Sequence, residues 1–305
     1  MSVRIGISLI AWQNDDLPEM TAAHSMEEAL QDSRDIGYSG VERGRRMPSD
    51  PEELRRFLAA ERLALCGGWY SMNLLTNDVA TEREAIRPQL DQFIALNAPC
   101  IVCCETSNAV HGQRAVPIQD RPKLTRDEIA AWGAKLSELA KWTADRGMTI
   151  AYHHHMGSIV EDPEDLAWFL EATAPEVTLC YDTGHLLFGG GDPLEALRRH
   201  GDRVHHVHFK DVRPAIMARA RAERMSFLDA VLEGVFTVPG DPEGCIDFAD
   251  IAQELKRMDY DGWIVVEAEQ DPKKAPPRRY SQIGHDRIVE VCAAAGLAVE
   301  AAVPA

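Results

Sequence analysis

Near the middle of the chain one stretch reads Val177-Thr178-Leu179-Cys180-Tyr181-Asp182-Thr183-Gly184-His185. Its apolar part predicts a short buried strand, and Asp182 stands where a parallel strand would end. Gly184 loosens the turn that follows, so that His185 can come next. A carboxylate and an imidazole at the carboxyl end of a strand suit a divalent metal that prefers oxygen and nitrogen ligands. Taken alone the motif is weak evidence for a metal site, because an aspartate at a strand end often only caps a helix.

Three other strand-like runs also end in residues that can bind metals. They are Ile150–Tyr152 before His153, Val204–Val207 before His208, and Trp263–Val266 before Glu267. The rest of the chain can be read as a scaffold that brings these four strand ends together.

Strand-like and helix-like segments alternate eight times, without a Ser/Gly-rich linker. Strands are expected at Arg4–Leu9, Gly40–Glu42, Leu63–Cys66, Cys100–Cys104, Thr149–Tyr152, Val177–Tyr181, Val204–Phe209 and Gly262–Val266. Helices are expected at Met26–Ile36, Pro51–Ala60, Glu82–Leu96, Thr125–Arg146, Pro163–Ala172, Pro193–His200, Phe248–Met258 and Tyr280–Ala295. A capping box is expected where Ser25 precedes Glu28 by three residues. Glycines 67 and 68 with Trp69 and Tyr70 are expected to form a loop after the third strand.

Such alternation predicts an α/β protein with a parallel sheet. Eight units over 305 residues fit a closed (β/α)8 TIM barrel, as one domain spanning residues 1–305 with an insertion at about 212–244. The insertion would lie between the seventh strand and its helix. An open doubly wound sheet is disfavoured, because no GxGxxG motif follows the first strand.

Composition narrows the class of protein further. The chain carries 49 acidic and 32 basic residues, a formal charge of -17, which argues against a general basic face for nucleic acid. Its seven cysteines are an odd number without a CxxC motif, so a reducing compartment and no disulfide framework are expected. Neither a signal peptide nor an apolar stretch long enough for a bilayer is recognisable. These features predict a cytoplasmic protein that binds neither nucleic acid nor a membrane, and they leave a homo-oligomer open.

In a barrel the active site lies at the carboxyl ends of the strands. We therefore expect Asp182, His208, Glu267 and His153 to hold a divalent metal, with His155 as the alternative to His153. In the run from His205 to Lys210 the side chains alternate, so His206, His208 and Lys210 share one face. Two carboxylates and two imidazoles around an open position suit Mn²⁺, Co²⁺ or Zn²⁺, which can polarise a carbonyl group.

Other residues at this end of the barrel are candidates for catalysis and for substrate binding. Lys210 and Glu105 are candidates for proton transfer, Lys210 as a neutral base beside the cation. His185 could contact the substrate, bond to a ligand or hold a second metal. Trp12 and Trp69 could wall the apolar face of a ring, with Asn14 and His155 as further substrate contacts. The purely structural interpretations are a core position for each tryptophan and an ion pair for Lys210.

Seven motifs together resemble the inosose dehydratase family, within the xylose isomerase-like barrel superfamily. They are Ala11–Asp16, Glu105–Ser107, Tyr152–Gly157, Asp182–His185, His206–Pro214, Phe236–Gly240 and Val266–Pro272. The resemblance implies an enzyme of inositol catabolism that removes water from 2-keto-myo-inositol and gives a trihydroxycyclohexane-dione. It implies a Mn²⁺ or Co²⁺ requirement and metal ligands from strands five to eight. At strand five this chain has His153 where the superfamily commonly has glutamate, so the fourth ligand stays open.

Three other functions remain open at this point. A sugar or keto-polyol isomerase or epimerase would use the same metal without losing water. A relative of the apurinic-site endonucleases would require a basic groove, which the charge opposes. A non-catalytic polyol-binding protein would have no need of a complete ligand set.

Overall fold

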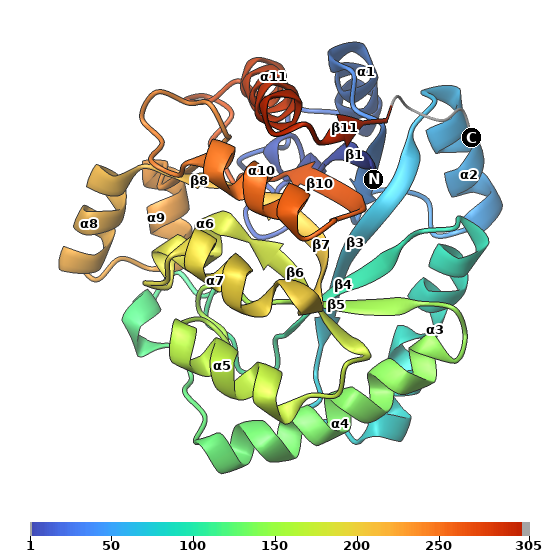
Figure 1. Ribbon diagram of the computed structural model, residues 1–305, viewed down its shortest axis with the longest axis vertical. Coiled ribbons are helices and arrows are strands. Elements are labelled where there is room, and N and C mark those ends of the chain that lie inside the picture. Colours follow the sequence, from blue (N-terminus) through green and yellow to red (C-terminus); the bar gives the residue numbers. More distant parts are fainter. Residues whose placement is uncertain (1, 301–305) are drawn as a thin grey trace.

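The computed structural model describes residues 2–300, and its centre is a closed barrel of eight parallel strands surrounded by helices (Figure 1). The barrel strands are β1 (Ser2–Ile7), β2 (Gly40–Arg43), β3 (Ala64–Met72), β4 (Cys100–Glu105), β5 (Thr149–His153), β6 (Val177–Asp182), β7 (Val204–Phe209) and β10 (Gly262–Val266). They pair in chain order, and β10 pairs with β1 to close the ring. Outside the ring, β11 (Ala298–Val299) pairs with the start of β1. The predicted (β/α)8 barrel is therefore confirmed.

The helices that cover the barrel are α1 (Met26–Ile36), α2 (Pro51–Ala60), α3 (Val79–Ala95), α4 (Arg126–Ala144), α5 (Pro163–Ala172), α6 (Thr183–Phe188), α7 (Pro193–His200), α10 (Phe248–Arg257) and α11 (Pro277–Ala295). Short 3-10 turns lie at Leu9–Ala11, Ile118–Asp120 and Gly201–Arg203. Within residues 2–300, no helix combines the length and the apolar character that a bilayer crossing requires.

Side chains at the helix starts explain where several helices begin. Ser25 and Asp50 each accept a hydrogen bond from the backbone N–H three residues later, which satisfies a donor that the helix leaves unpaired. The capping box predicted at Ser25 forms only by half, because the Glu28 carboxylate turns to the ring of His24 at 3.2 Å. The reciprocal box forms instead at Thr125 and Glu128, where α4 begins.

The structure corrects the prediction at the ends of the third and sixth strands. The third strand does not stop at Cys66 but continues through the expected loop to Met72, because Trp69–Met72 pair with Val102–Glu105 of β4. Gly67 has a φ of +152° beside a register shift between β2 and β3, so a bulge rather than a loop occupies this point. In addition, the turn expected after Asp182 is helix α6.

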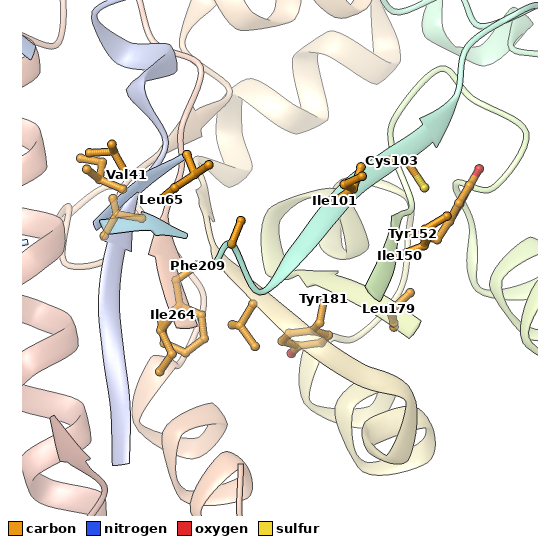
Figure 2. Packing of buried hydrophobic residues seen from close by; sticks show 14 of the residues in the cluster. Val41, Leu65, Ile101, Cys103, Ile150, Tyr152, Leu179, Tyr181, Phe209 and Ile264 are labelled. Atoms are coloured by element: carbon orange, nitrogen blue, oxygen red, sulfur yellow. The ribbon is translucent and has the colours of Figure 1, made fainter. Parts of the chain in front are cut away.

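Strand alternation divides the buried residues between two layers. Side chains such as Ile101, Tyr152, Tyr181 and Ile264 belong to the core between strands and helices (Figure 2). The alternate positions fill the barrel interior with small groups, among them Cys100, Val102, Ala151 and Cys180. All seven cysteines are free thiols and six are buried, as expected where cysteine serves as a small hydrophobe.

The segment between β7 and α10 adds elements beside the ends of the strands. It contains β8 (Asp211–Val212), α8 (Pro214–Ala222), α9 (Phe227–Glu233) and β9 (Phe236–Thr237), and β8 pairs with β9 antiparallel. Helices α8 and α9 lie at the side of the barrel next to α6 (Figure 1). Their apolar residues form a separate small core that includes Phe188, Phe227 and Phe236. This core places two aromatic rings against His185, at centroid distances of 6.0 and 5.1 Å.

A buried cluster of charges ties α5 to the long loop before α4. The Arg121 guanidinium is 3% exposed and faces the carboxylates of Glu161, Asp162 and Asp165. One positive charge thus meets three carboxyl groups. Burial raises the pKa of Glu161 to about 7, with Asp165 and Asp162 adding to the rise and Arg121 opposing it.

This raised pKa leads to a prediction for Glu161→Gln. The folded protein holds the Glu161 proton more tightly than the unfolded chain, so stability is lost as pH rises from about 4.5 to about 7. The neutral amide avoids that loss, and we expect the variant to be more stable than the wild type by about 1–3 kcal/mol at pH 8 and nearly equal at pH 4.5. Chemical denaturation at both pH values measures this difference. Glu164→Gln, an exposed change at the start of α5 three residues further along the chain, is the control, and a destabilised Glu161→Gln at pH 8 would contradict the prediction.

Candidate active site

A cavity opens at the carboxyl ends of the barrel strands. Its polar lining includes Glu42, His153, His155, His208, Glu267 and Glu269, and Trp69 forms part of its wall. The walls therefore combine imidazoles and carboxylates with an aromatic face.

Four of the predicted residues meet at the base of this cavity. Asp182 and His208 are direct neighbours across β6 and β7, and His153 stands at the end of β5. The Asp182 Oδ2 atom lies 3.3 Å from His153 Nε2 and 3.5 Å from His208 Nδ1, and His208 Nδ1 lies 4.0 Å from Glu267 Oε2. The structure thus brings His153, Asp182, His208 and Glu267 together.

Two of these atoms, Asp182 Oδ2 and His208 Nδ1, are buried without a hydrogen-bond partner among the described residues. They lie within 4.8 Å of a carboxylate oxygen of Glu267, whose Oε2 atom is in direct contact with the Lys210 ammonium group. Buried polar atoms without partners are costly, and a cation among them would remove that cost. An oxygen, nitrogen and oxygen donor set of this kind fits a divalent transition metal.

The two candidate histidines of β5 have different surroundings. His153 adjoins Asp182, and burial lowers the pKa of its ring to about 4, so the ring is neutral at pH 7 as a ligand must be. His155 lies with its ring 4.0 Å from that of His185, and His155, His185 and Glu269 form a second group whose ligand atoms lie within 4.8 Å. The geometry favours His153 over His155 beside Asp182.

Glu42, near the carboxyl end of β2, had no predicted role, and its carboxylate orients the ring of His208. Its Oε1 atom accepts hydrogen bonds from His206 Nε2 at 3.0 Å and His208 Nε2 at 2.9 Å. Burial would raise the pKa of Glu42, but His208 and His206 outweigh it and keep the pKa well below its usual range. With Nε2 donating to Glu42, the Nδ1 lone pair of His208 faces Asp182 and Glu267.

Lys210 forms an ion pair in this structure, and its role as a neutral base beside a bound cation stays a prediction. It is fully buried and lies behind the cavity lining, with Nζ 2.8 Å from Glu269 Oε2, 3.5 Å from Asp182 Oδ2 and in direct contact with Glu267. Burial would lower the pKa of Lys210, but Asp182, Glu267 and Glu269 together raise it. His185 lies behind His155, with Nε2 2.9 Å from Lys210 Nζ.

Three predicted site residues point elsewhere. Glu105 faces α4, where its carboxylate accepts hydrogen bonds from Trp132 Nε1 at 3.0 Å and the Leu75 N–H at 3.2 Å. The Trp12 indole is fully buried and donates to Asp32. The Asn14 side chain accepts from the N–H groups of Asp16 and Leu17 and so stabilises a turn. None of the three lines the cavity, because each side chain already has a structural partner.

Trp69 remains in the wall of the cavity as predicted. It is 38% exposed, and its ring meets the rings of His153 and His155 edge-on at 5.8 and 5.6 Å. Six further lining residues were not among the predicted site residues, and they are Gln13, Asp15 and Asp16 after β1, Arg43 at the end of β2, Arg45 beyond it, and His111 after β4. Only their position soon after strands could have drawn attention to them.

The closed barrel of eight parallel strands, with candidate metal ligands at the ends of β5, β6, β7 and β10, fits the class of xylose isomerase-like TIM barrels. The sequence profile of that family, described as xylose isomerase-like TIM barrel, matches residues 30–289, and the chain belongs to this family. Within it, the chain is similar to inosose dehydratases, as the next comparisons show.

The chain is 39% identical to the inosose dehydratase of Geobacillus thermodenitrificans over 95% of this chain and 97% of the relative. It is 37% identical to that of Clostridium tetani, over 92% and 94%. It is also 43% identical to the rhizopine catabolism protein MocC of Rhizobium meliloti, over 99% and 92%. The predicted resemblance and the prediction of a dehydratase enzyme are confirmed by these relatives.

Solved structures extend the likeness of the fold. A probable 3-DHS dehydratase, AsbF of Bacillus anthracis, superposes with a TM-score of 0.65 at 14% identity, covering 95% of this chain and 99% of the other. An L-ribulose 3-epimerase superposes with a TM-score of 0.66 at 16% identity, covering 96% of each chain. At such identities the likeness supports the barrel alone.

Proposed function

We propose that this enzyme removes water from 2-keto-myo-inositol with a divalent metal, Mn²⁺ or Co²⁺, held by His153, Asp182, His208 and Glu267. The observation that carries the proposal is identity of 37–39% with inosose dehydratases over more than nine-tenths of the chain. The unpaired Asp182 Oδ2 and His208 Nδ1 atoms, with the Glu267 carboxylate beside them, support the metal part of it. Bound there, the ion would polarise the ketone and acidify the neighbouring C–H bond.

His155 is the residue best placed to move the proton. It lines the cavity, and its Nδ1 lies 2.7 Å from the Met156 carbonyl oxygen, to which it donates. The Nε2 atom then carries the lone pair. Burial, with His111 and His153 adding to the effect, lowers the pKa of His155, so the ring is a neutral base at pH 7.

The transfer can be completed by the same ring. His155 Nε2 takes the proton from the carbon beside the ketone, and the resulting imidazolium can return that proton to the hydroxyl group that leaves from the next carbon. The proton and the hydroxyl group leave together as water, a carbon–carbon double bond forms, and no oxidant is required. Trp69 would cover one face of the substrate's six-membered ring, while Gln13, Asp16 and Arg43 offer hydrogen bonds to the hydroxyl groups of the substrate.

Mass spectrometry of 2-keto-myo-inositol after incubation with the protein tests this function. The protein is first stripped of metal and then assayed with and without Mn²⁺. We expect a metal-dependent product lighter by one water. An isomer of unchanged mass would instead indicate an isomerase or epimerase, and no conversion with any divalent ion would refute the proposed substrate.

Glu42 supplies a prediction for the metal site. Glu42→Gln should weaken Mn²⁺ binding about 10–100-fold, because residues that orient a metal ligand have effects of this size. The neutral amide attracts the His208 Nε2 proton less strongly than the carboxylate does. The ring of His208 is then less firmly oriented, and its Nδ1 atom is less basic. Isothermal titration with Mn²⁺ measures the change. The matched control is Glu82→Gln, since Glu82 is also buried but bonds to Tyr70 and Asn77 away from the cavity, and equal effects of both changes would refute the role.

A further inference from the structure

The Lys210 ammonium occupies the space between two groups of metal-binding side chains. One group is the proposed metal site, Asp182, His208 and Glu267, and the other is His155, His185 and Glu269. All six side chains are buried, with exposed fractions no greater than 7%. The second group has a metal-binding composition but has no part as a metal site in the function proposed above.

Lys210 Nζ contacts both groups at once. It touches Glu267 of the first group and lies 2.8 Å from Glu269 Oε2 and 2.9 Å from His185 Nε2 of the second. It also lies 3.5 Å from Asp182 Oδ2. Three carboxylates therefore surround one ammonium group, as they would surround a bound cation, and the His185 ring lies beside it.

The fold holds this side chain in place along its whole length. A Cβ atom on Gly184 would lie 2.5 Å from Lys210 Cγ, so glycine at this position makes room for the lysine stem. The φ of Gly184 is not positive, and its role is therefore space rather than the looser turn that the sequence predicted. The Thr183 hydroxyl bonds the Lys210 backbone at N and O, and the Phe236 ring lies 4.6 Å from Nζ.

We propose that Lys210 is a built-in cation that fills a second cation position, formed by His155, His185 and Glu269, and so limits the chain to one divalent metal. The proposal rests on the proposed metal site. Asp182, Glu267 and Glu269 all face Lys210 Nζ, and one ammonium with one divalent ion would balance the charges of three carboxylates. A second divalent ion is then excluded both by charge and by the atoms of Lys210.

Metal counting tests the proposal. The wild type and Lys210→Ala are stripped, loaded with excess Mn²⁺, freed of unbound ion and analysed for manganese per chain. We expect one ion in the wild type and two in Lys210→Ala, with a spin-coupled pair in the electron paramagnetic resonance spectrum. The double variant Lys210→Ala/Glu269→Gln should return to one ion. Lys135→Ala, which removes a lysine that bonds the Leu74 and Asn77 carbonyls, should keep one.

The outcomes separate this inference from the proposed function. A wild type that binds no divalent ion refutes the metal site itself. A wild type with two ions, or a folded Lys210→Ala with one, overturns only the role of Lys210. If Lys210→Ala does not fold, Lys210→Met keeps most of the stem volume without the charge and is subject to the same count.

Discussion

Asp182→Asn is expected to weaken Mn²⁺ binding by more than about 100-fold, beyond the 10–100-fold typical of residues that only orient a ligand. We expect kcat/KM to fall by at least about 1,000-fold, because metal ions supply several kcal/mol of stabilisation to such transition states. The physical reason is that Oδ2, the atom 3.3 Å from His153 and 3.5 Å from His208, loses its negative charge. Titration with Mn²⁺ and assay of water loss measure the two effects.

The amide should leave the fold intact, which makes the result interpretable. Asp182 Oδ1 accepts the His185 N–H at 2.8 Å and caps α6, and an asparagine oxygen can accept the same bond. The matched control is Asp192→Asn, because Asp192 caps α7 through the Glu195 N–H at 3.0 Å but lies outside the cavity lining. Full activity and Mn²⁺ affinity in Asp182→Asn would show that the metal site is placed wrongly.

The proximity of the four proposed ligands could be predicted from the sequence, because the sequence shows where the strands end. In a closed parallel barrel every carboxyl end lies on one rim, so His153, Asp182, His208 and Glu267 had to lie near one another once the fold was inferred. Neither the distances nor the unpaired atoms follow from this argument. They depend on the register, which makes Asp182 the direct neighbour of His208.

Glu105 shows that a position at a strand end does not reveal whether the side chain points into the barrel. Both faces of a parallel strand are buried, so the apolar run gives no sign of which positions point inward. Ile101 and Cys103 pack in the outer core, and Glu105 follows them in the same phase toward Trp132. Asp182 stands in the opposite phase, after the interior residue Cys180. A shift of one residue thus separates a structural carboxylate from a site carboxylate.

Lys210 illustrates a second limit. Alternation along β7 correctly predicted that its side chain shares a face with His208, but its charge depends on neighbours from other elements. Asp182 and the two glutamates that follow β10, Glu267 and Glu269, raise the pKa of Lys210. Long-range electrostatics of this kind have no local signal in the sequence.

His155→Gln is expected to lower kcat about 100- to 10,000-fold, the range typical for loss of a general base. The amide can still donate a hydrogen bond toward the Met156 carbonyl oxygen, but it has no basic nitrogen to take the substrate proton. Because His155 lies away from Asp182 and His208, one Mn²⁺ per chain should still bind with nearly unchanged affinity. Steady-state assay and metal analysis of the same preparation separate these two properties.

The control for this change is His205→Gln, near the start of β7, where the ring lies 3.4 Å from the Pro99 carbonyl oxygen just before β4 and is not part of the cavity lining. It should retain both activity and metal. Loss of Mn²⁺ together with activity in His155→Gln would make His155 the fourth ligand and His153 its neighbour. A kcat within about tenfold of the wild type would remove His155 from the proton transfer and leave Glu269 as the cavity group nearest to that role, since its carboxylate lines the cavity and is held by Lys210.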